Sequence, residues 1–89
     1  MQHLDIIVTG KVQGVFFRAS TKTIADDMGI CGFVRNEPDG NVFIAAEAEP
    51  AQLEQFLAWC HQGPRNARVT AVHSQEGSVK GYKTFEVRR

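Results

Sequence analysis

Eighty-nine residues predict a single domain over residues 1–89 with one modest core. Lysine plus arginine and aspartate plus glutamate number 10 each, so the formal net charge is zero, which argues against non-specific nucleic-acid binding because such binding needs a basic surplus. No apolar run has membrane-spanning length and the start lacks a signal-peptide pattern, so we expect a cytoplasmic monomer that contacts neither membrane nor nucleic acid.

The chain opens with a pattern typical of a strand followed by a helix. Over His3–Thr9 apolar residues occupy every second position, which indicates a strand. Gly10–Phe17 is rich in glycine and is predicted to be a loop. Residues 18–28 carry apolar side chains at helical spacing, and Gly29 suits the left-handed position that ends a helix.

A β-hairpin and a second helix are predicted next. The strands Cys31–Asn36 and Asn41–Glu49 flank Asp39-Gly40, a pair favoured in tight turns. The helix opens at Glu49-Pro50, since proline is favoured at the first helical position, and Gly63-Pro64 ends it. Its buried stripe is predicted to consist of Leu53, Phe56, Leu57 and Cys60.

Two further strands, Arg68–Glu76 and Lys83–Arg89, complete the predicted order. Strand, helix, strand, strand, helix, strand and a last strand indicate an α+β, ferredoxin-like split βαβ sandwich. In that fold two helices cover one face of an antiparallel sheet, here of four or five strands. The fold hosts many activities, so it does not decide the function.

The segment TGKVQGVFFRAS joins the first strand to the first helix and has the features of an anion site. Backbone N–H groups at a helix start have no helical partner, and the helix dipole adds positive charge there. Gly10 and Gly14 let the backbone approach a ligand, and the planar fork of Arg18 can bind two phosphate oxygens. A ligand-free turn with a solvated arginine is the alternative. The spacing matches neither GxxxxGK[ST] nor GxGxxG, so no nucleotide cofactor is expected.

Asn36 ends a strand just before the predicted hairpin. An asparagine beside a turn often bonds its own backbone. The functional alternative is a carboxamide that orients a water molecule, donating through its NH₂ and accepting through its oxygen.

Two segments together carry a family resemblance. GKVQGVFFR (Gly10–Arg18) and GFVRN (Gly32–Asn36) resemble the G-x-V-Q-G-V-x-[FY]-R and G-[FWY]-V-x-N segments of the acylphosphatases. QGPRNARVTAV (Gln62–Val72) is similar to that family's approach to its fourth strand. Length and element order agree as well, so the resemblance extends over the whole chain.

The resemblance implies hydrolysis of the carboxyl-phosphate bond of small acyl phosphates to a carboxylate and inorganic phosphate, without a metal or other cofactor. The family's phosphate-binding arginine falls on Arg18 and its water-orienting asparagine on Asn36. Inorganic phosphate or sulfate is the expected anion ligand. Glu37 stands where the family often has threonine or serine. The loop whose amides hold the phosphate falls on Gln13, Gly14, Val15, Phe16 and Phe17.

The chemistry agrees with the lack of acids and bases in these segments. A carboxylate is a good leaving group, so no side chain has to protonate it. Catalysis then rests on positioning and charge stabilisation. A phosphate oxygen of the substrate would accept the proton of the attacking water.

Other polar residues are expected to be structural. His3, His61 and His73 lie on three separate elements and are predicted to be surface or packing residues, because a histidine base needs a partner within reach. Glu47 and Glu49 are predicted on the outer side of a strand, without an opposing carboxylate for paired chemistry.

Phe16-Phe17 is predicted to be core at the base of the loop, with the lining of an acyl pocket as its alternative. Cys31 and Cys60 have no metal-type spacing. They are expected to be reduced, mostly buried thiols, although a bridge between them stays open.

Two other functions are compatible with this order of elements. An RNA-binding module of the RRM type has this element order but needs exposed aromatics on its central strands, and Phe43 alone fits. The second rival is a regulatory or maturation module without turnover, like the first domain of the hydrogenase-maturation carbamoyltransferases. Those usually have proline after the arginine and continue into cysteine-rich segments; here Ala19 follows and the chain stops at Arg89, which favours a free-standing enzyme.

Overall fold

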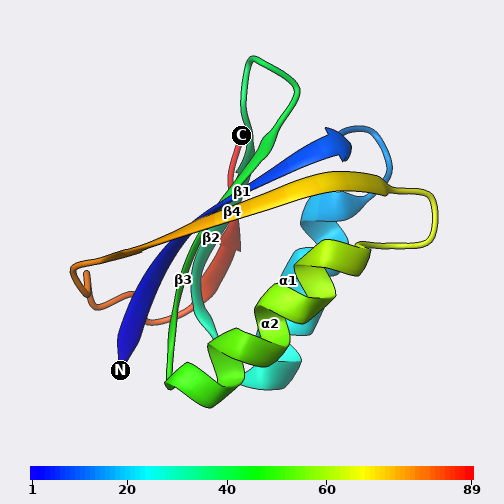
Figure 1. Ribbon diagram of the computed structural model, residues 1–89. Helices are drawn as coiled ribbons and strands as arrows, with labels where there is room; N and C mark the ends of the chain where they lie inside the picture. The colour runs from blue at the N-terminus through cyan, green and yellow to red at the C-terminus, as the bar shows by residue number, and fades with distance from the viewer.

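Two helices lie on one face of a five-stranded sheet in the computed structural model of the chain, which describes all residues from Met1 to Arg89 (Figure 1). The sheet order is β4-β1-β3-β2-β5. This arrangement confirms the predicted ferredoxin-like split βαβ fold. The elements are β1 (Gln2–Lys11), α1 (Phe17–Met28), β2 (Cys31–Asn36), β3 (Val42–Ala48), α2 (Pro50–Gln62), β4 (Arg68–Gly77) and β5 (Phe85–Val87).

The four longer strands pair antiparallel, as predicted, and β5 adds a short parallel edge. Its residues Phe85–Val87 run beside Gly32–Val34 of β2, so the sheet as a whole is mixed. On its other side β2 lies close to β3 at Gly32, where an added Cβ would lie 1.8 Å from the carbonyl oxygen of Ala45 in β3. Glycine is therefore required there by the packing of backbone against backbone.

The first strand is longer than its alternation indicated. Gly10 and Lys11, predicted to be loop, continue β1 because they pair with Val69 and Arg68 of β4. The loop proper is therefore residues 12–16, and α1 begins at Phe17. The last strand is shorter than predicted, since only Phe85–Val87 pairs.

The core lies between the helices and the sheet. The predicted inward faces are confirmed: Ile6 and Val8 of β1 and Phe56 of α2 are fully buried. Cys60 packs in the same cluster, and burial raises the pKa of its thiol to about 12, so it stays protonated at neutral pH. Cys31 is half-buried, and both thiols are free. No helix here combines the length and apolar character that crossing a bilayer needs.

Glu47 corrects the expectation that both glutamates of β3 are solvated. Glu49 is exposed, but Glu47 is fully buried, because the segment after β4 folds over the helix-free face of the sheet. The carboxylate accepts hydrogen bonds from the backbone N–H groups of residues 80–82 at 2.6–3.2 Å and lies 2.7 Å from Nδ1 of His3. Burial by itself raises the pKa of Glu47, but these hydrogen bonds outweigh it, so the pKa lies below its ordinary value of 4.5.

Replacing Glu47 should flatten the acid limb of the stability curve. A carboxyl whose pKa is lowered by folding stabilises the native state above its unfolded pKa, and that contribution is lost as pH falls through the folded pKa. Glu47→Gln should therefore lower the free energy of unfolding by about 2 kcal/mol at pH 7 and lose much less between about pH 5 and pH 3 than the wild type does.

Urea unfolding across that pH range measures both quantities. Glu54→Gln is the matched control, since Glu54 is exposed on α2. Parallel curves for Glu47→Gln and wild type would contradict the assignment of the acid limb to this carboxylate.

Candidate functional site

The loop 12–16 turns the chain from β1 into α1 through two left-handed residues. Gly14 has φ 72° and Phe16, the N-cap of α1, has φ 62°. A non-glycine residue in this region costs about 1 kcal/mol or more, and such strain is common at functional sites. Phe16 and Phe17 therefore point apart: Phe17 is in the core, with its ring 5.5 Å from that of Trp59, whereas the side chain of Phe16 is 80% exposed. The prediction that both are core was wrong for Phe16.

The loop leaves its backbone N–H groups free to meet a ligand. Hydrogen bonds from loops and helix ends include none donated by the amides of residues 13–17, and the first such bond of α1 runs from Ser20 to the carbonyl of Phe16. These amides precede or open a twelve-residue helix, whose dipole adds positive charge at the same end. The loop is thus a set of unpaired donors suited to an anion.

The side chain of Gln13 fixes this loop to the hairpin between β2 and β3. Its Nε2 donates to the carbonyl of Glu37 at 2.8 Å and to the carbonyl of Asn41 at 2.9 Å. Those two residues also pair with each other through the backbone, from the Glu37 N–H to the Asn41 carbonyl. Gln13 therefore ties the loop to the end of β2 that carries Asn36.

The sheet register explains why Asn36 lies near this loop. Val42 of β3 pairs with Val8 on one side and with Asn36 on the other, so the carboxyl ends of β1 and β2 meet at the same edge. The Oδ1 atom of Asn36 is buried and has no hydrogen-bond partner in the protein. A buried acceptor without a partner is costly, which points to a ligand or water at this atom.

Arg18 in the first turn of α1 reaches toward the same edge. Its Nη1 donates to the carbonyl of Arg88 at 3.0 Å, which anchors the guanidinium beside the end of β5. It forms no ion pair with a carboxylate in the structure. The other N–H groups of the fork remain available to a second acceptor.

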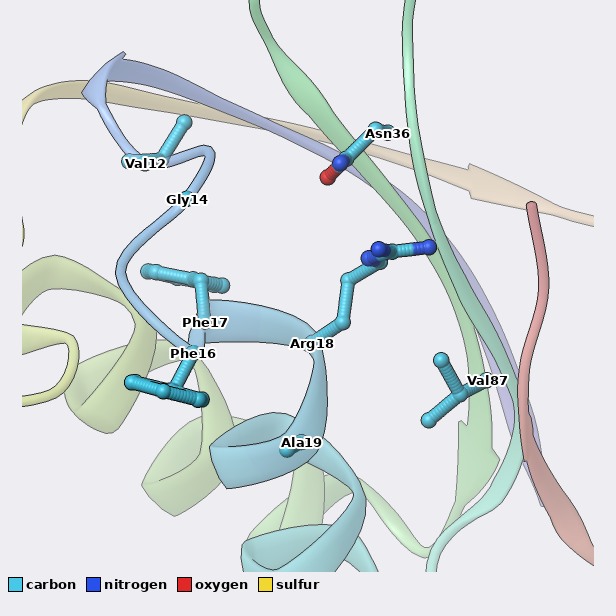
Figure 2. A pocket seen from close by; sticks show the side chains of 8 residues that line it. All are labelled: Val12, Gly14, Phe16, Phe17, Arg18, Ala19, Asn36 and Val87. Carbon is cyan, nitrogen blue, oxygen red and sulfur yellow. The ribbon is translucent and has the colours of Figure 1, made fainter.

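A cavity of about 330 Å³ joins Arg18 and Asn36 to part of the loop. Of the predicted loop residues, Gly14, Phe16 and Phe17 line it, whereas Gln13 and Val15 do not. Figure 2 shows the guanidinium of Arg18 extending from the start of α1 below Asn36, with the loop on the opposite side of the space. The site thus has a cation, a run of free amides and an unpaired carboxamide oxygen around one opening. Its lining consists of Val12, Gly14, Phe16, Phe17, Arg18, Ala19, Asn36 and Val87.

Glu37 does not bring its charge into this cavity. Its carboxylate accepts from Nε and Nη2 of Arg35, each at 3.3 Å, and is not among the lining residues. Arg35 in turn lies over the ring of Phe43, 4.8 Å from its centre. The pair is held away from Arg18 because successive side chains of a strand point to opposite faces.

The site also uses groups that the sequence did not indicate. The carbonyl of Arg88 holds the guanidinium of Arg18, and Val87 lines the cavity. Both positions depend on the parallel pairing of β5 with β2. The sequence of the last seven residues predicts a strand there but does not indicate which strand it pairs with. The sequence indicates Gln13 only for its backbone amide, whereas in the structure its side chain holds the loop to the hairpin.

The histidines lie outside the cavity. His61 and His73 are exposed on α2 and β4, and His3 is buried between Glu47 and Asp5. These places agree with the prediction of surface or packing residues. No group of three His, Cys, Asp or Glu side chains is arranged to hold a metal ion.

Comparison with known proteins gives a consistent family. The family model described as Acylphosphatase matches residues 4–87. An acylphosphatase of Nocardioides sp. is 46% identical over 85 residues, covering 96% of this chain and 86% of its own length. The crystal structure of acylphosphatase from Bacillus subtilis superimposes with a TM-score of 0.97 at 34% identity and full coverage of both chains. Full-length HypF aligns with a TM-score of 0.87 at 27% identity, over 99% of this chain but 12% of HypF.

Removing the side chain of Gln13 should loosen the loop and weaken anion binding. In Gln13→Ala the hairpin carbonyls lose their shared donor, so binding has to order a mobile loop, and the Kd for inorganic phosphate should rise about tenfold. Calorimetric titration with phosphate measures this, with Gln55→Ala on the exposed face of α2 as control. A Kd equal to that of the control would show that the two hydrogen bonds serve stability alone.

Proposed function

Because the chain belongs to the acylphosphatase family, we propose that Arg18, the backbone amides of residues 13–17 and Asn36 carry out its hydrolysis of acyl phosphates. The activity itself is that of the family: a hydrolase that acts on small-molecule acyl phosphates. The role of each residue is proposed from a hydrogen bond, an unpaired polar atom or a place in the lining of the cavity.

The free Oδ1 of Asn36 is the observation that carries the proposal. A carboxamide oxygen without a partner accepts a hydrogen bond from a water molecule, and its NH₂ group can donate to the same water or to a phosphate oxygen. Asn36 lines the cavity together with Arg18. A water held at Asn36 would face a phosphoryl group held by Arg18, which supports in-line attack.

Arg18 and the loop amides supply the positive charge that the phosphoryl group requires. The charge of a phosphoryl group in transfer is spread over its three equatorial oxygens. Preorganised donors stabilise that charge without reorganising during the reaction. The amides of residues 13–17 are such donors, and the contact of Arg18 with the Arg88 carbonyl fixes the guanidinium in advance.

The proposed step needs no protein acid or base. The oxygen of water forms a bond to phosphorus as the bond between phosphorus and the acyl oxygen breaks. The electron pair leaves with the carboxylate, which is stable without a proton. The proton of the water passes to a phosphate oxygen of the substrate. This scheme agrees with a cavity lining that contains no histidine, aspartate or glutamate.

The apolar part of the cavity suits the acyl group. Phe16 is 80% exposed and lines the opening together with Val12 and Val87. An exposed aromatic ring beside an anion site offers a surface for a hydrocarbon or aryl group. Phe16 would thus line the acyl pocket, the alternative role expected for the Phe16-Phe17 pair.

We further propose that residues 1–89 act as a single domain, as a monomer in the cytoplasm, without metal or cofactor. Two free cysteines suit a reducing compartment, and zero net charge suits a protein with a small-molecule partner. Inorganic phosphate or sulfate would occupy the phosphoryl position as a product-like ligand.

Hydrolysis of benzoyl phosphate tests the roles of Arg18 and Asn36. Arg18→Ala should lower kcat/KM about a thousandfold and weaken phosphate binding, since it removes the cation that faces the transferred group. Asn36→Ala should lower kcat about a hundredfold with a smaller change in phosphate affinity, since it removes only the water's acceptor. EDTA should change neither the wild type nor the variants.

Lys83→Ala is the control, because Lys83 is exposed in the segment after β4 and outside the cavity. Full activity in Asn36→Ala would refute the water-orienting role. A folded wild type that binds phosphate but does not hydrolyse acyl phosphates would favour the alternative, a binding module without turnover.

A further inference from the structure

A second hollow of about 490 Å³ lies across the loop from the cavity with Arg18 and Asn36. It is formed where the β1–α1 loop meets the connection from α2 to β4, and Figure 1 shows these two connections side by side at one end of the sheet. Its polar lining comes mainly from Lys11, Arg65, Asn66 and Arg68. We call it the basic groove.

The β1–β4 register places two of these cations against each other. The pairing shifts between Thr9 and Gly10, and beyond the shift Lys11 lies directly opposite Arg68. Gly10 permits this, because a Cβ there would lie 2.0 Å from the carbonyl oxygen of Arg68. Like charges directly opposite each other on a sheet destabilise it, unless an anion lies between them.

No carboxylate in the structure neutralises the groove. The six ion pairs of the molecule include none of Lys11, Arg65 and Arg68, and none of the three side chains forms a hydrogen bond within the protein. Arg35 and Arg88, by contrast, pair with the neighbouring Glu37 and Glu86. The excess positive charge is therefore local, in a chain whose net charge is zero.

The basic groove adjoins the proposed active site on the other side of the β1–α1 loop. Both hollows are lined by Gly14 and Phe16, and Val15 belongs to the groove as well. The exposed ring of Phe16 lies at the boundary between them. A substrate with its phosphoryl group at Arg18 and its acyl group over Phe16 would extend toward the groove, because Phe16 lines both hollows.

We propose that the basic groove is a second anion subsite, which selects acyl phosphates whose acyl part carries another anionic group, a carboxylate or a phosphate. Lys11, Arg65 and Arg68 would bind that group as specificity-determining residues. The proposal rests on the proposed function, since it takes the phosphoryl group to be bound at Arg18. Arginine forks suit either anion because they bind both geometries through paired N–H donors.

Two pairs of matched substrates test the subsite: benzoyl phosphate against its 3-carboxy and 4-carboxy derivatives. The wild type should have a kcat/KM about tenfold higher for at least one carboxylated substrate, the value of one charged hydrogen bond. The triple variant Lys11→Gln, Arg65→Gln, Arg68→Gln should lose this preference and retain its rate on benzoyl phosphate within a few-fold. Each single variant should lose part of the preference for the carboxylated substrate. The single variants therefore test the subsite even if the triple variant folds poorly.

Lys83→Gln is the charge control, since Lys83 is exposed near the other end of the sheet, beside the start of β2. A general attraction of anions would change the rates for all substrates and would respond to Lys83→Gln as well. Equal substrate ratios in the wild type and the triple variant, with hydrolysis intact, would overturn the subsite but not the proposed function. Loss of hydrolysis of every substrate by the wild type would overturn both.

Discussion

The unpaired backbone amides between the end of β1 and the first turn of α1 are the constraint on which the site depends. Buried or ordered N–H groups are nearly always satisfied in folded proteins, and those of residues 13–17 have no partner within this one. The left-handed turns at Gly14 and Phe16 hold them in this state, and the turn at Phe16 costs backbone strain because the residue is not a glycine. A bound anion would supply the acceptors, which would link the stability of the loop to its ligand.

The ferredoxin-like topology brings the remaining groups to that loop. Because β1 and β2 both pair antiparallel with β3, their carboxyl ends lie at one edge of the sheet. This register alone places Asn36 near the loop that follows β1. The short β5 then supplies the carbonyl that orients Arg18. Gln13 closes the arrangement by joining the loop to the hairpin. Three segments that are distant in sequence, residues 12–19, 36–41 and 87–88, thus form one cavity without a histidine or carboxylate base.

Sequence patterns predicted the elements well because their signals are local. Alternation, helical spacing and the Asp39-Gly40 turn each act within a few residues, and the sheet and helices follow them. The pairing of β5 and the cover over Glu47 were not predicted, because both depend on contacts between residues more than thirty positions apart. Phe16 was misplaced because its left-handed φ is unusual for a phenylalanine.

The candidate site shows the same division. The segments Gly10–Arg18 and Gly32–Asn36 indicated Arg18 and Asn36 through a family resemblance, whereas the cavity that both residues line depends on the fold. The basic charge of the groove was hidden in a net charge of zero, because only the β1–β4 register brings Lys11 opposite Arg68. Net charge sums over the whole chain, whereas anion binding depends on where the charged side chains gather on the surface.

Amide chemical shifts during titration with inorganic phosphate test the central claim most directly. If the loop amides hold the phosphoryl group, the first and largest changes in a ¹H–¹⁵N spectrum should fall on residues 14–17 and on the side-chain amide of Asn36, with downfield proton shifts typical of N–H donors to an anion. Changes confined to residues 65–68, or spread evenly over the basic side chains while residues 14–17 stay unmoved, would contradict the account.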